Sequence, residues 1–348
     1  MSQSVLIDLE RLKYPYTGLY NFAENLGREL ILQKDEKTHL TYFLPKKYEG
    51  SFGPDVDYFI QNPVQKFIFP FTGKFKAWHS TYQGSAYYPR NRSVKIIQTV
   101  HDLNFLYEKS HRPDKIKAQL KKIQAGLDRA DSITAISAFT LGEIENHLRL
   151  GNQERRVIYN GCQVKTFEGF DTPGYRPERP YLFSMGTVLP KKNFHVLPAL
   201  LVGNDYELVL AGLNQHPYQE KIWEEAARFG VRDRVHILGP VNEENKYWYY
   251  KNCLAFVFPS LAEGFGLPVV ESMYFGKPLF LSDKTSLPEI GGDLAYYFRD
   301  FDPEHMRAVF ESGINVFDIQ LGPKLLRARY EFFSWKNAAS QYLPLYSL

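Results

Sequence analysis

Residues 259–271 have the sequence Pro-Ser-Leu-Ala-Glu-Gly-Phe-Gly-Leu-Pro-Val-Val-Glu, and this stretch decides the fold that we expect. It follows residues 254–258, an apolar run whose aromatic and β-branched side chains predict a buried strand. After Gly266, a proline near the start of an apolar segment predicts the first turn of a helix. The free N–H groups and the positive dipole end of such a strand-to-helix turn suit an anionic ligand, for instance a diphosphate.

Strands and helices alternate along the chain. The expected strands cover residues 5–10, 38–44, 94–100, 132–136, 156–159, 181–185, 206–210, 234–238, 254–258, 278–281 and 294–298, and residues 66–70 and 77–79 are short apolar pieces. The expected helices include those that begin at Gly18, at Arg112, after the N-cap Ser137 and at Asn193. This alternation predicts parallel sheets covered by helices on both faces. Because 348 residues exceed what one core usually supports, the predicted fold class is α/β, with two doubly wound domains and a linker at about residues 162–178.

The composition favours a protein of the cytosol. Its two cysteines, Cys162 and Cys253, make neither a disulfide framework nor a metal cluster. No charged and apolar leader opens the sequence, and no apolar run approaches the roughly 20 residues of a membrane span. We therefore expect a soluble, cytoplasmic protein.

Charge is unevenly distributed along the chain. Residues 1–165 contain 24 Lys and Arg against 17 Asp and Glu, whereas residues 166–348 contain 18 against 22. Residues 63–122 hold much of the basic excess, mixed with aromatic side chains. Either two solvated surfaces differ by chance, or the first domain faces an anionic partner such as a membrane that carries a lipid-linked substrate. Nucleic acid is a weaker alternative, because no nucleic-acid motif accompanies the basic residues.

Candidate site residues follow the strands, since ligands of parallel α/β sheets bind beyond the carboxyl ends of the strands. In the first domain these candidates are the loop before Gly18, His79 and the pair His101-Asp102. In the second domain they lie in residues 186–193, 212–214, 239–241, 263–267, 282–283 and 287–289. Histidines thus dominate the first set, and Gly, Lys and Glu the second.

Several blocks of the sequence resemble one family. They are residues 99–102 (Thr-Val-His-Asp), 130–137 (Ala-Asp-Ser-Ile-Thr-Ala-Ile-Ser), 157–161 (Val-Ile-Tyr-Asn-Gly), 186–193 (Gly-Thr-Val-Leu-Pro-Lys-Lys-Asn), 234–241 (Arg-Val-His-Ile-Leu-Gly-Pro-Val), 259–273 and 286–293 (Ser-Leu-Pro-Glu-Ile-Gly-Gly-Asp). In this order they resemble the retaining glycosyltransferases of family 4, the glycosyl transferases group 1. The resemblance runs from about Gly18 to the C-terminus and implies the GT-B fold, in which two Rossmann-like domains face a central cleft.

The resemblance assigns one substrate to each domain. Residues 1–165 would bind the acceptor, with a last helix at about residues 334–348 packing back on them, and residues 176–333 would hold a nucleoside-diphosphate sugar. The donor-binding residues that it implies are Gly18, Lys191, Lys192, Asn193, Val241, Glu263, Gly264, Phe265, Gly266, Leu267 and Glu271. The implied acceptor-binding residues are His79 and Asp102, although Asp102 could instead cap the next turn.

The implied catalytic residues are His101, Glu263 and Lys192. By the resemblance, Glu263 would bind hydroxyls of the transferred sugar and His101 would lie against that sugar, while Glu271 would bind the ribose. Lys192 would neutralise the diphosphate, whose charge grows in the transition state.

One position departs from a common form of the family pattern. Many members have an arginine after the first glycine of the block at 186–193, whereas this chain has Thr187. Other members share the form found here. Whether Lys191 takes over the role of that arginine stays open at the level of sequence.

The expected function is transfer of a hexosyl unit, of mannosyl or glucosyl type, with retention at the anomeric carbon. The acceptor would be a hydroxyl of a glycan or lipid-linked molecule in cell-surface polysaccharide or glycoconjugate synthesis. We expect no cofactor and no metal, because the sequence has no aspartate cluster of the kind that holds Mg²⁺.

Partners and alternatives complete the expectation. The chain would be a monomer or weak dimer without nucleic acid, and the basic first domain could bring it to the inner face of an anionic membrane. The alternatives are a nucleotide-sugar epimerase or hydrolase of the same fold, or a subunit that binds a nucleotide sugar without turnover.

Overall fold

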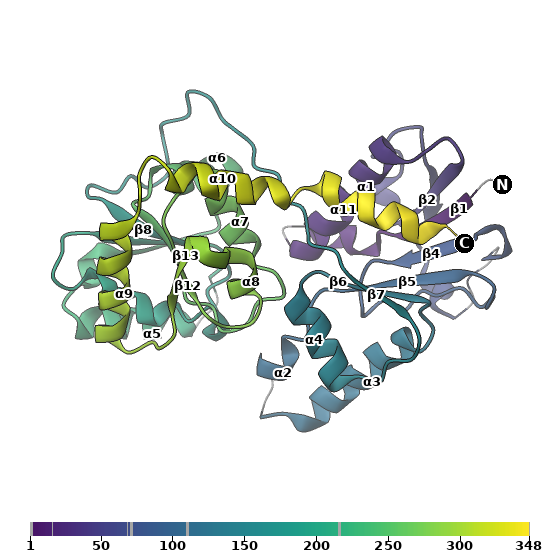
Figure 1. The fold of residues 1–348 in the computed structure, drawn as a ribbon, viewed down its shortest axis with the longest axis horizontal. Helices are drawn as coiled ribbons and strands as arrows, with labels where there is room; N and C mark the ends of the chain where they lie inside the picture. Colours follow the sequence, from purple (N-terminus) through teal and green to yellow (C-terminus); the bar gives the residue numbers. More distant parts are fainter. Residues whose placement is uncertain are drawn as a thin grey trace. The chain divides into compact units, whose positions relative to one another are not determined.

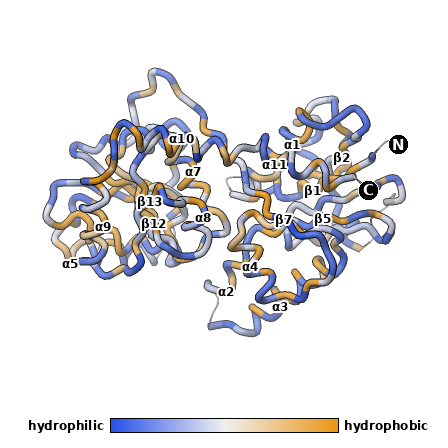
Figure 2. The backbone as a smooth tube through the Cα atoms, viewed as in Figure 1, coloured by the Kyte–Doolittle hydropathy of each residue, from blue (hydrophilic) through white to orange (hydrophobic). Residues whose placement is uncertain are grey.

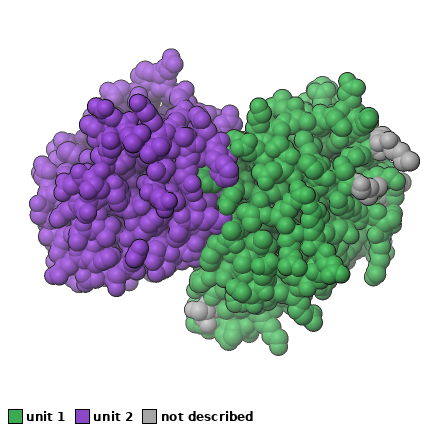
Figure 3. All heavy atoms as spheres, in the orientation of Figure 1, with its two compact units in different colours: residues 1–161, 333–348 green, residues 162–332 purple. Residues whose placement is uncertain are grey.

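The chain divides into two units in the computed structural model, which describes residues 3–15, 17–67, 69, 72–108, 111–214 and 217–347. Unit 1 comprises residues 1–161 and 333–348, and unit 2 comprises residues 162–332 (Figure 3). Residues 162–165, which the sequence analysis placed in the first domain, belong to unit 2, and Phe333 belongs to unit 1.

Unit 1 has a parallel sheet with the strand order β3-β2-β1-β4-β5-β6-β7. Its strands are β1 (Gln3–Asp8), β2 (Thr38–Leu44), β3 (Asp57–Ile60), β4 (Ala77–Ser80), β5 (Lys95–Val100), β6 (Ser132–Ala135) and β7 (Glu154–Val157). The central strands are buried almost throughout, as expected for a sheet covered on both faces. The sequence analysis missed β3, whose four residues have little apolar alternation.

Helices cover both faces of this sheet (Figure 1). On one face lie α3 (Pro113–Leu127) and α4 (Ala138–His147), and Ser137 caps α4 by accepting a hydrogen bond from Thr140 N, as predicted. On the other face α1 (Gly18–Gln33) lies beside α11 (Trp335–Tyr342), which returns from the far end of the sequence. A short helix, α2 (Phe105–Glu108), follows β5.

The C-terminal segment is fastened to the unit 1 sheet by a buried hydroxyl network. His79 Nδ1 lies 2.9 Å from the hydroxyl of Tyr346, and His79 Nε2 lies 2.8 Å from Thr99 Oγ1. Thr99 Oγ1 in turn lies 3.2 Å from the hydroxyl of Tyr342. Because buried polar groups are costly unless paired, this network ties the position of α11 to that of β4 and β5.

Unit 2 repeats the parallel design with the strand order β10-β9-β8-β11-β12-β13. Its strands are β8 (Tyr181–Met185), β9 (Glu207–Ala211), β10 (Val235–Gly239), β11 (Ala255–Phe258), β12 (Leu279–Ser282) and β13 (Ala295–Phe298). Its α-helices are α5 (Tyr218–Arg228), α6 (Glu243–Asn252), α7 (Leu267–Tyr274), α8 (Leu287–Gly291), α9 (Pro303–Val316) and α10 (Gly322–Phe332). Figure 2 shows apolar residues concentrated along β12.

The segment after Asn193 differs from the predicted α-helix. It forms a 3₁₀ helix, η6 (Phe194–Leu201), with Pro198 inside. Proline has no N–H to donate and its ring crowds the preceding turn, so a regular α-helix is disfavoured there. The segment is nevertheless buried by its apolar side chains, so the error concerns the hydrogen-bond pattern and not the packing.

Each sheet has one point where the order of its strands reverses. In unit 1 this point lies between β1 and β4, and in unit 2 between β8 and β11. Ligands of open α/β sheets bind outside the carboxyl ends of the strands at such points. The topology therefore selects the residues after β1 and β4, and those after β8 and β11. Among the helices of the described ranges, none has both the length and the apolar character of a membrane span.

Candidate functional site

The loop after β8 makes a close backbone contact that needs glycine. Gly186 has a φ of 147°, and Gly212, with a φ of 139°, passes so near that a Cβ on it would lie 2.1 Å from the Gly186 carbonyl oxygen. The loop then forms a 3₁₀ turn, η5 (Pro190–Lys192), and ends on Asn193 in the left-handed region at φ 57°. Asparagine tolerates this region better than most residues. The turn points the Lys192 side chain back across Gly186, where a Cβ in place of the glycine hydrogen would lie 3.1 Å from Lys192 Cε.

The loop after β11 is bound to this first loop. Leu261 N donates to the carbonyl of Lys191 over 2.7 Å, and Ser260 Oγ donates to the same carbonyl over 3.3 Å. Gly264 and Phe265 are buried, and Gly266 adopts a φ of 102° as the N-cap of α7. A Cβ at Gly266 would lie 2.9 Å from Leu287, so the turn into α7 requires glycine for both its φ and its space.

Lys192 and Glu263 form an ion pair across these two loops. Nζ of Lys192 pairs with Oε1 of Glu263, which also accepts a hydrogen bond of 2.6 Å from Ser260 Oγ. The two side chains are only 10% and 13% exposed, and Nζ lies 4.7 Å from the centroid of the Phe258 ring. No spacing in the sequence links the two residues, so the pair shows that the predicted sugar-binding and diphosphate-binding residues share one site.

Hydroxyl groups of the segment after β12 hold the Glu263 backbone. Glu263 N donates to Thr285 Oγ1 over 3.0 Å, and Ser286 Oγ donates to the carbonyls of Glu263 and Phe265, each over 3.0 Å. Thr285 has a φ of 53°, a conformation that a β-branched residue rarely adopts. Such strain persists only where the surroundings enforce it, and it concentrates at functional sites.

The sequence analysis did not single out Thr285 or Ser286. It named residues 282–283 and 287–289 for their place after a strand and left out the residues between them, although the run Ser282-Asp-Lys-Thr-Ser286 contains three hydroxyls. This run of hydroxyl side chains was the signal in the sequence from which a role in holding the backbone could have been predicted. The left-handed conformation of Thr285 had none, because threonine gives no local indication of a positive φ.

Glu271 lies in a second ion pair, on α7. Its Oε1 is 2.7 Å from Lys246 Nζ, and its Oε2 accepts a hydrogen bond of 3.0 Å from the hydroxyl of Tyr250. Burial alone would lower the pKa of Lys246, but the Glu271 carboxylate outweighs burial and the pKa is raised. Lys246 and Tyr250 stand four positions apart on α6, so they share one face of that helix. The sequence analysis missed both residues.

The other predicted donor-binding residues of unit 2 lie at the same edge of the sheet. Leu267 is the half-buried first residue of α7, and Val241 is half-buried just after β10, which ends on Gly239 at a φ of 74°. Lys191 is half-buried and contributes its carbonyl to the loop contact described above. Its role in place of the arginine absent at Thr187 stays a prediction.

In unit 1, His101 follows β5 and is buried against α1. Its Nε2 lies 2.8 Å from the carbonyl of Thr81, which can only accept, so Nε2 carries the proton and Nδ1 is an acceptor. Phe22 packs edge-on against the ring at 4.6 Å. Burial lowers the pKa of His101 to about 4, so the imidazole is neutral at pH 7.

The prediction that His79 contacts the acceptor is wrong. His79 is completely buried, and both ring nitrogens are used in the network with Tyr346 and Thr99. Burial lowers its pKa to about 3. A histidine after a short apolar run is ambiguous in sequence, because a residue on either face of a strand has the same neighbours.

Asp102 and Gly18 lie at the same edge of the unit 1 sheet. Asp102 Oδ1 accepts a hydrogen bond of 3.0 Å from Asn104 N, which is the turn-capping alternative; its acceptor contact stays a prediction. Gly18 is the exposed first residue of α1, after the N-cap Thr17, and a Cβ on it would meet no atom within 4 Å. The described protein atoms therefore do not require glycine here, and the predicted approach of a diphosphate stays a prediction.

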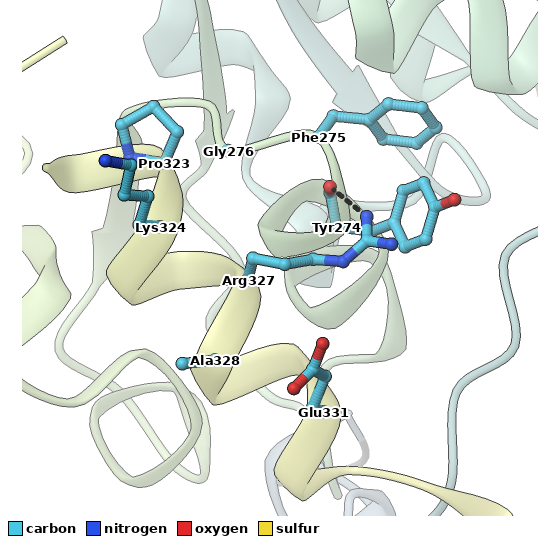
Figure 4. A pocket seen from close by; sticks show the side chains of 8 residues that line it. All are labelled: Tyr274, Phe275, Gly276, Pro323, Lys324, Arg327, Ala328 and Glu331. Atoms are coloured by element: carbon cyan, nitrogen blue, oxygen red, sulfur yellow. Dashed lines mark hydrogen bonds between the residues drawn. The ribbon is translucent and has the colours of Figure 1, made fainter. Parts of the chain in front are cut away.

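A surface pocket of about 460 Å³ lies elsewhere in unit 2 and includes none of the predicted site residues (Figure 4). Arg327 of α10 spans it, with Nη1 donating to the Tyr274 carbonyl over 2.8 Å and Cζ 3.5 Å from the centroid of the Tyr274 ring. These contacts show that the pocket lies where α10 packs against the end of α7. In the described residues, no group of three His, Cys, Asp or Glu side chains is placed to hold a metal ion.

Comparison with known proteins agrees with this geometry. A model of the family described as glycosyl transferases group 1 matches residues 168–311, which lie within unit 2. The O-antigen chain mannosyltransferase B of Escherichia coli is 27% identical over 295 residues, covering 77% of this chain and 74% of that protein. The serotype-specific mannosyltransferase WbdA of Escherichia coli is 30% identical over 70% of this chain, which spans only 32% of that longer protein.

A solved structure extends the comparison to the whole fold. Sucrose-phosphate synthase from Thermosynechococcus elongatus superposes with a TM-score of 0.75 at 17% identity, covering 99% of this chain and 98% of the other. The fold is GT-B, with two parallel-sheet α/β domains, as predicted. Residues 168–311 of this chain are thus similar to the group 1 glycosyl transferases.

Proposed function

We propose that this chain is a retaining hexosyltransferase that moves a mannosyl or glucosyl unit from a nucleoside-diphosphate sugar to a hydroxyl of a glycan or lipid-linked acceptor. The observation that carries this proposal is the Lys192–Glu263 pair at the switch point of unit 2, beside the turn into α7. The family match and the names of the mannosyltransferase relatives support it, and they favour a role in polysaccharide synthesis.

A bound donor would give Lys192 and Glu263 new partners, in place of part of their contact with each other. A diphosphate beside Lys192 gives the ammonium a second anion, and a sugar hydroxyl gives the Glu263 carboxylate a donor. As the glycosidic bond breaks, charge grows on the diphosphate, and a preorganised cation stabilises that state more than the ground state. The backbone N–H groups from Gly264 to Leu267 and the start of α7 would add to this stabilisation. Glu271 would then bind the ribose, with Lys246 and Tyr250 fixing its carboxylate.

Retention is assigned to a same-face reaction. A double displacement needs a carboxylate nucleophile next to the anomeric carbon, whereas the Glu263 carboxylate is engaged by Lys192 and Ser260. The departing phosphate oxygen would instead take the proton of the acceptor hydroxyl. His101, neutral and with Nδ1 as an acceptor, would receive a hydrogen bond from the transferred sugar. No cofactor or metal enters this scheme.

The exposed side of α3 supports a further part of the proposal, contact with an anionic membrane surface. Ile116, Leu120 and Ile123 of this helix pack on the unit 1 core. Its exposed residues include the bases Lys115, Lys117, Lys121 and Lys122, and its N-cap residue Arg112 is also exposed. Each base near an anionic leaflet adds about 1 kcal/mol of attraction. Binding to phosphatidylserine vesicles that falls with salt, and that weakens when these bases become Gln, tests this contact.

The test of function is a panel of nucleotide sugars given with and without a membrane extract as the acceptor source. We expect transfer from one mannosyl or glucosyl donor, and a loss of turnover of roughly 10²-fold or more in Glu263→Ala and in Lys192→Ala, as for other preorganised electrostatic contacts. Glu311→Ala is a matched control, because Glu311 is an exposed carboxylate of α9 in unit 2, outside the candidate site residues.

The outcomes separate the alternatives. Near-normal activity of both variants with the fold intact contradicts the site assignment. Epimerisation, or fast release of sugar without acceptor, identifies an epimerase or hydrolase, and nucleotide-sugar binding without any turnover identifies a binding subunit. An inverted anomeric product contradicts the same-face reaction alone.

A further inference from the structure

The carboxyl ends of β1, β4 and β5 in unit 1 are bound into one rigid platform. Thr81 Oγ1 donates to the carbonyl of Asp8, and the carbonyl of Thr81 accepts from His101. Ser85 Oγ donates to Asp8 Oδ2 over 2.6 Å, and Glu10 N donates to Asp8 Oδ1 over 3.0 Å. These strands flank the switch point of unit 1, where a ligand of an open α/β sheet is expected.

A cluster of charged side chains stands on this platform. It is formed by Glu10, Arg11 and Lys13, all in the 3₁₀ helix η1 (Glu10–Lys13) that follows β1. Glu10 is buried, and its carboxylate pairs with Lys13 Nζ and, at 3.1 Å, with Arg11 Nε. The sequence analysis assigned Glu10 to the end of a strand and named the loop before Gly18 as a site candidate, without singling out these charged residues. The charged side chains of Glu10, Arg11 and Lys13 come together only because the chain makes the tight turn of η1.

Arg11 is held in place but keeps unused donors. Its guanidinium carbon lies 3.7 Å from the centroid of the Tyr82 ring, and its side chain is 19% exposed. Among the residues that the structure describes, none pairs with Nη1 or Nη2 of Arg11. A guanidinium fixed by stacking loses less entropy for each hydrogen bond it then makes. The Nη groups are therefore a preorganised donor fork at the switch point.

We propose that Arg11, stacked on Tyr82 and paired with Glu10, binds the terminal sugar of the acceptor glycan through neighbouring hydroxyls. This inference rests on the proposed function and names the acceptor-binding residues in unit 1. Arg11 donates to two hydroxyl oxygens, and the Glu10 carboxylate accepts from a hydroxyl. His101 lies on the same platform through its hydrogen bond to the Thr81 carbonyl. In this proposal the acceptor contact that was wrongly predicted at His79 of β4 is made instead by Arg11, which follows the neighbouring strand β1.

The charge of the cluster favours a neutral ligand over an anion. Glu10, Arg11 and Lys13 carry one negative and two positive charges, and Asp8 lies directly beneath them. With both carboxylates ionised the cluster has no net charge, so it offers little attraction to a phosphate group. Paired cations and carboxylates do offer both donors and acceptors, which is what sugar hydroxyls require.

The test measures binding to each unit separately, using the full chain. The probes are α-mannotriose for unit 1, by saturation-transfer NMR, and GDP and UDP for unit 2, by calorimetry. The variants are Arg11→Ala and Arg11→Lys. The lysine variant keeps the positive charge but loses the paired N–H donors of the guanidinium. Arg28→Ala is the matched control, since Arg28 also pairs with a glutamate and lies over an aromatic ring, 5.2 Å from the centroid of Phe52. Circular dichroism checks that each variant is folded.

We expect both Arg11 variants to bind α-mannotriose roughly 10-fold more weakly or worse, as for lost hydrogen bonds to a charged group. Nucleotide binding and the Arg28→Ala variant should be unchanged. Unaltered α-mannotriose binding by Arg11→Ala overturns the proposal. So does competition by inorganic phosphate for Arg11, which identifies an anion site, or loss of nucleotide binding, which assigns Arg11 to the donor. Failure of the wild-type chain to use any nucleotide sugar contradicts the proposed function but leaves the two binding results to decide this site.

Discussion

The two units share a parallel sheet with one switch point, yet they build the edge of that sheet differently. In unit 2 each strand from β8 to β12 ends on a residue of positive φ or is followed by one within eight positions. These residues are Gly186, Gly212, Gly239, Gly266 and Thr285. In unit 1 the described residues of positive φ are Gly50 and Gly53 alone, and neither follows β1, β4 or β5. The edge of unit 1 is built from side chains, including Glu10, Arg11 and His101.

The difference suits two kinds of ligand. Backbone groups brought close by glycine bind the parts that all nucleotide sugars share, a diphosphate and a ribose, in a form that side-chain changes do not alter. Side chains on a rigid platform can be exchanged without moving the backbone. A backbone-built edge therefore fits a common donor, and a side-chain-built edge fits a particular acceptor.

Gly212→Ala gives the largest expected effect, because it attacks the backbone-built edge directly. The new Cβ would lie 2.1 Å from the Gly186 carbonyl oxygen at a φ of 139°, so two strand ends must separate. We expect a loss of at least about 3 kcal/mol in the stability of unit 2. Urea unfolding combined with hydrogen exchange of β8 and β9 peptides measures it.

The matched control in unit 1 is Gly18→Ala, where a Cβ meets open space. Alanine favours the first turn of α1 by up to about 1 kcal/mol, so this variant should be as stable as the wild type or slightly more so. If Gly212→Ala were as stable as the wild type, the edge of the unit 2 sheet would not depend on the close backbone contact at Gly212, and the difference drawn between the two units would be wrong.

Asp8→Asn is expected to change the pH dependence of unit 1. Burial raises the pKa of Asp8 from its ordinary 3.8 to about 6, so the folded chain holds this proton more tightly than the unfolded chain. Stability contributed by Asp8 is therefore present below pH 4 and lost as the pH rises to about 6. Asparagine keeps an acceptor for Glu10 N and a donor for Ser85, so at pH 8 the variant should be more stable by up to about 3 kcal/mol.

Hydrogen exchange of β1 peptides at pH 5 and pH 8 measures this difference. Burial lowers the pKa of His101 to about 4. The stability that neutral His101 contributes therefore changes in the opposite direction, because it is lost as the pH falls below the ordinary histidine pKa of 6.5. That slope is common to both proteins, so their difference isolates Asp8. An equal difference at the two pH values would show that Asp8 titrates normally.

Thr285→Val gives the smallest expected effect and sharpens the description of the unit 2 edge. Valine keeps the shape and the strained backbone but leaves Glu263 N without its acceptor. We expect kcat to fall about 10-fold, since one unpaired buried N–H costs about 1–3 kcal/mol and displaces Glu263. Thr285→Ser keeps the hydroxyl and should retain most of the activity. Equal kinetics of Val and Ser would show that only the strained conformation matters.

Much of the fold followed from local patterns. The strands β2 and β8 and the start of α1 have the predicted bounds, and Ser137 caps α4 as expected. Alternating strands and helices required parallel sheets, and the length required two domains. The short β3 and the 3₁₀ form of η6 were missed, because four weakly patterned residues or one internal proline change hydrogen bonding without changing the apolar pattern.

The candidate site followed less completely. The residue types of Lys192, Glu263 and Glu271 pointed to a donor site through their blocks, whereas their pairing with each other or with Lys246 had no sequence signal. His79 and Arg11 show the two kinds of error. His79, a strand residue taken for a ligand contact, is buried behind α11, whereas Arg11, which was not named although the loop before Gly18 was a candidate, is held on Tyr82.

The sequence by itself determined the alternation of strands and helices, the two-domain organisation and the turn from β11 into α7, because these depend on the periodicity of apolar residues and on glycine and proline within a few positions. Only the tertiary structure decided which charges meet. Lys192 and Glu263 are 71 positions apart, and Arg11 and Tyr82 are also far apart in the chain. Such pairs form where parallel strands end at one edge of a sheet, and the order of strands in the sheet is set by packing of the whole unit.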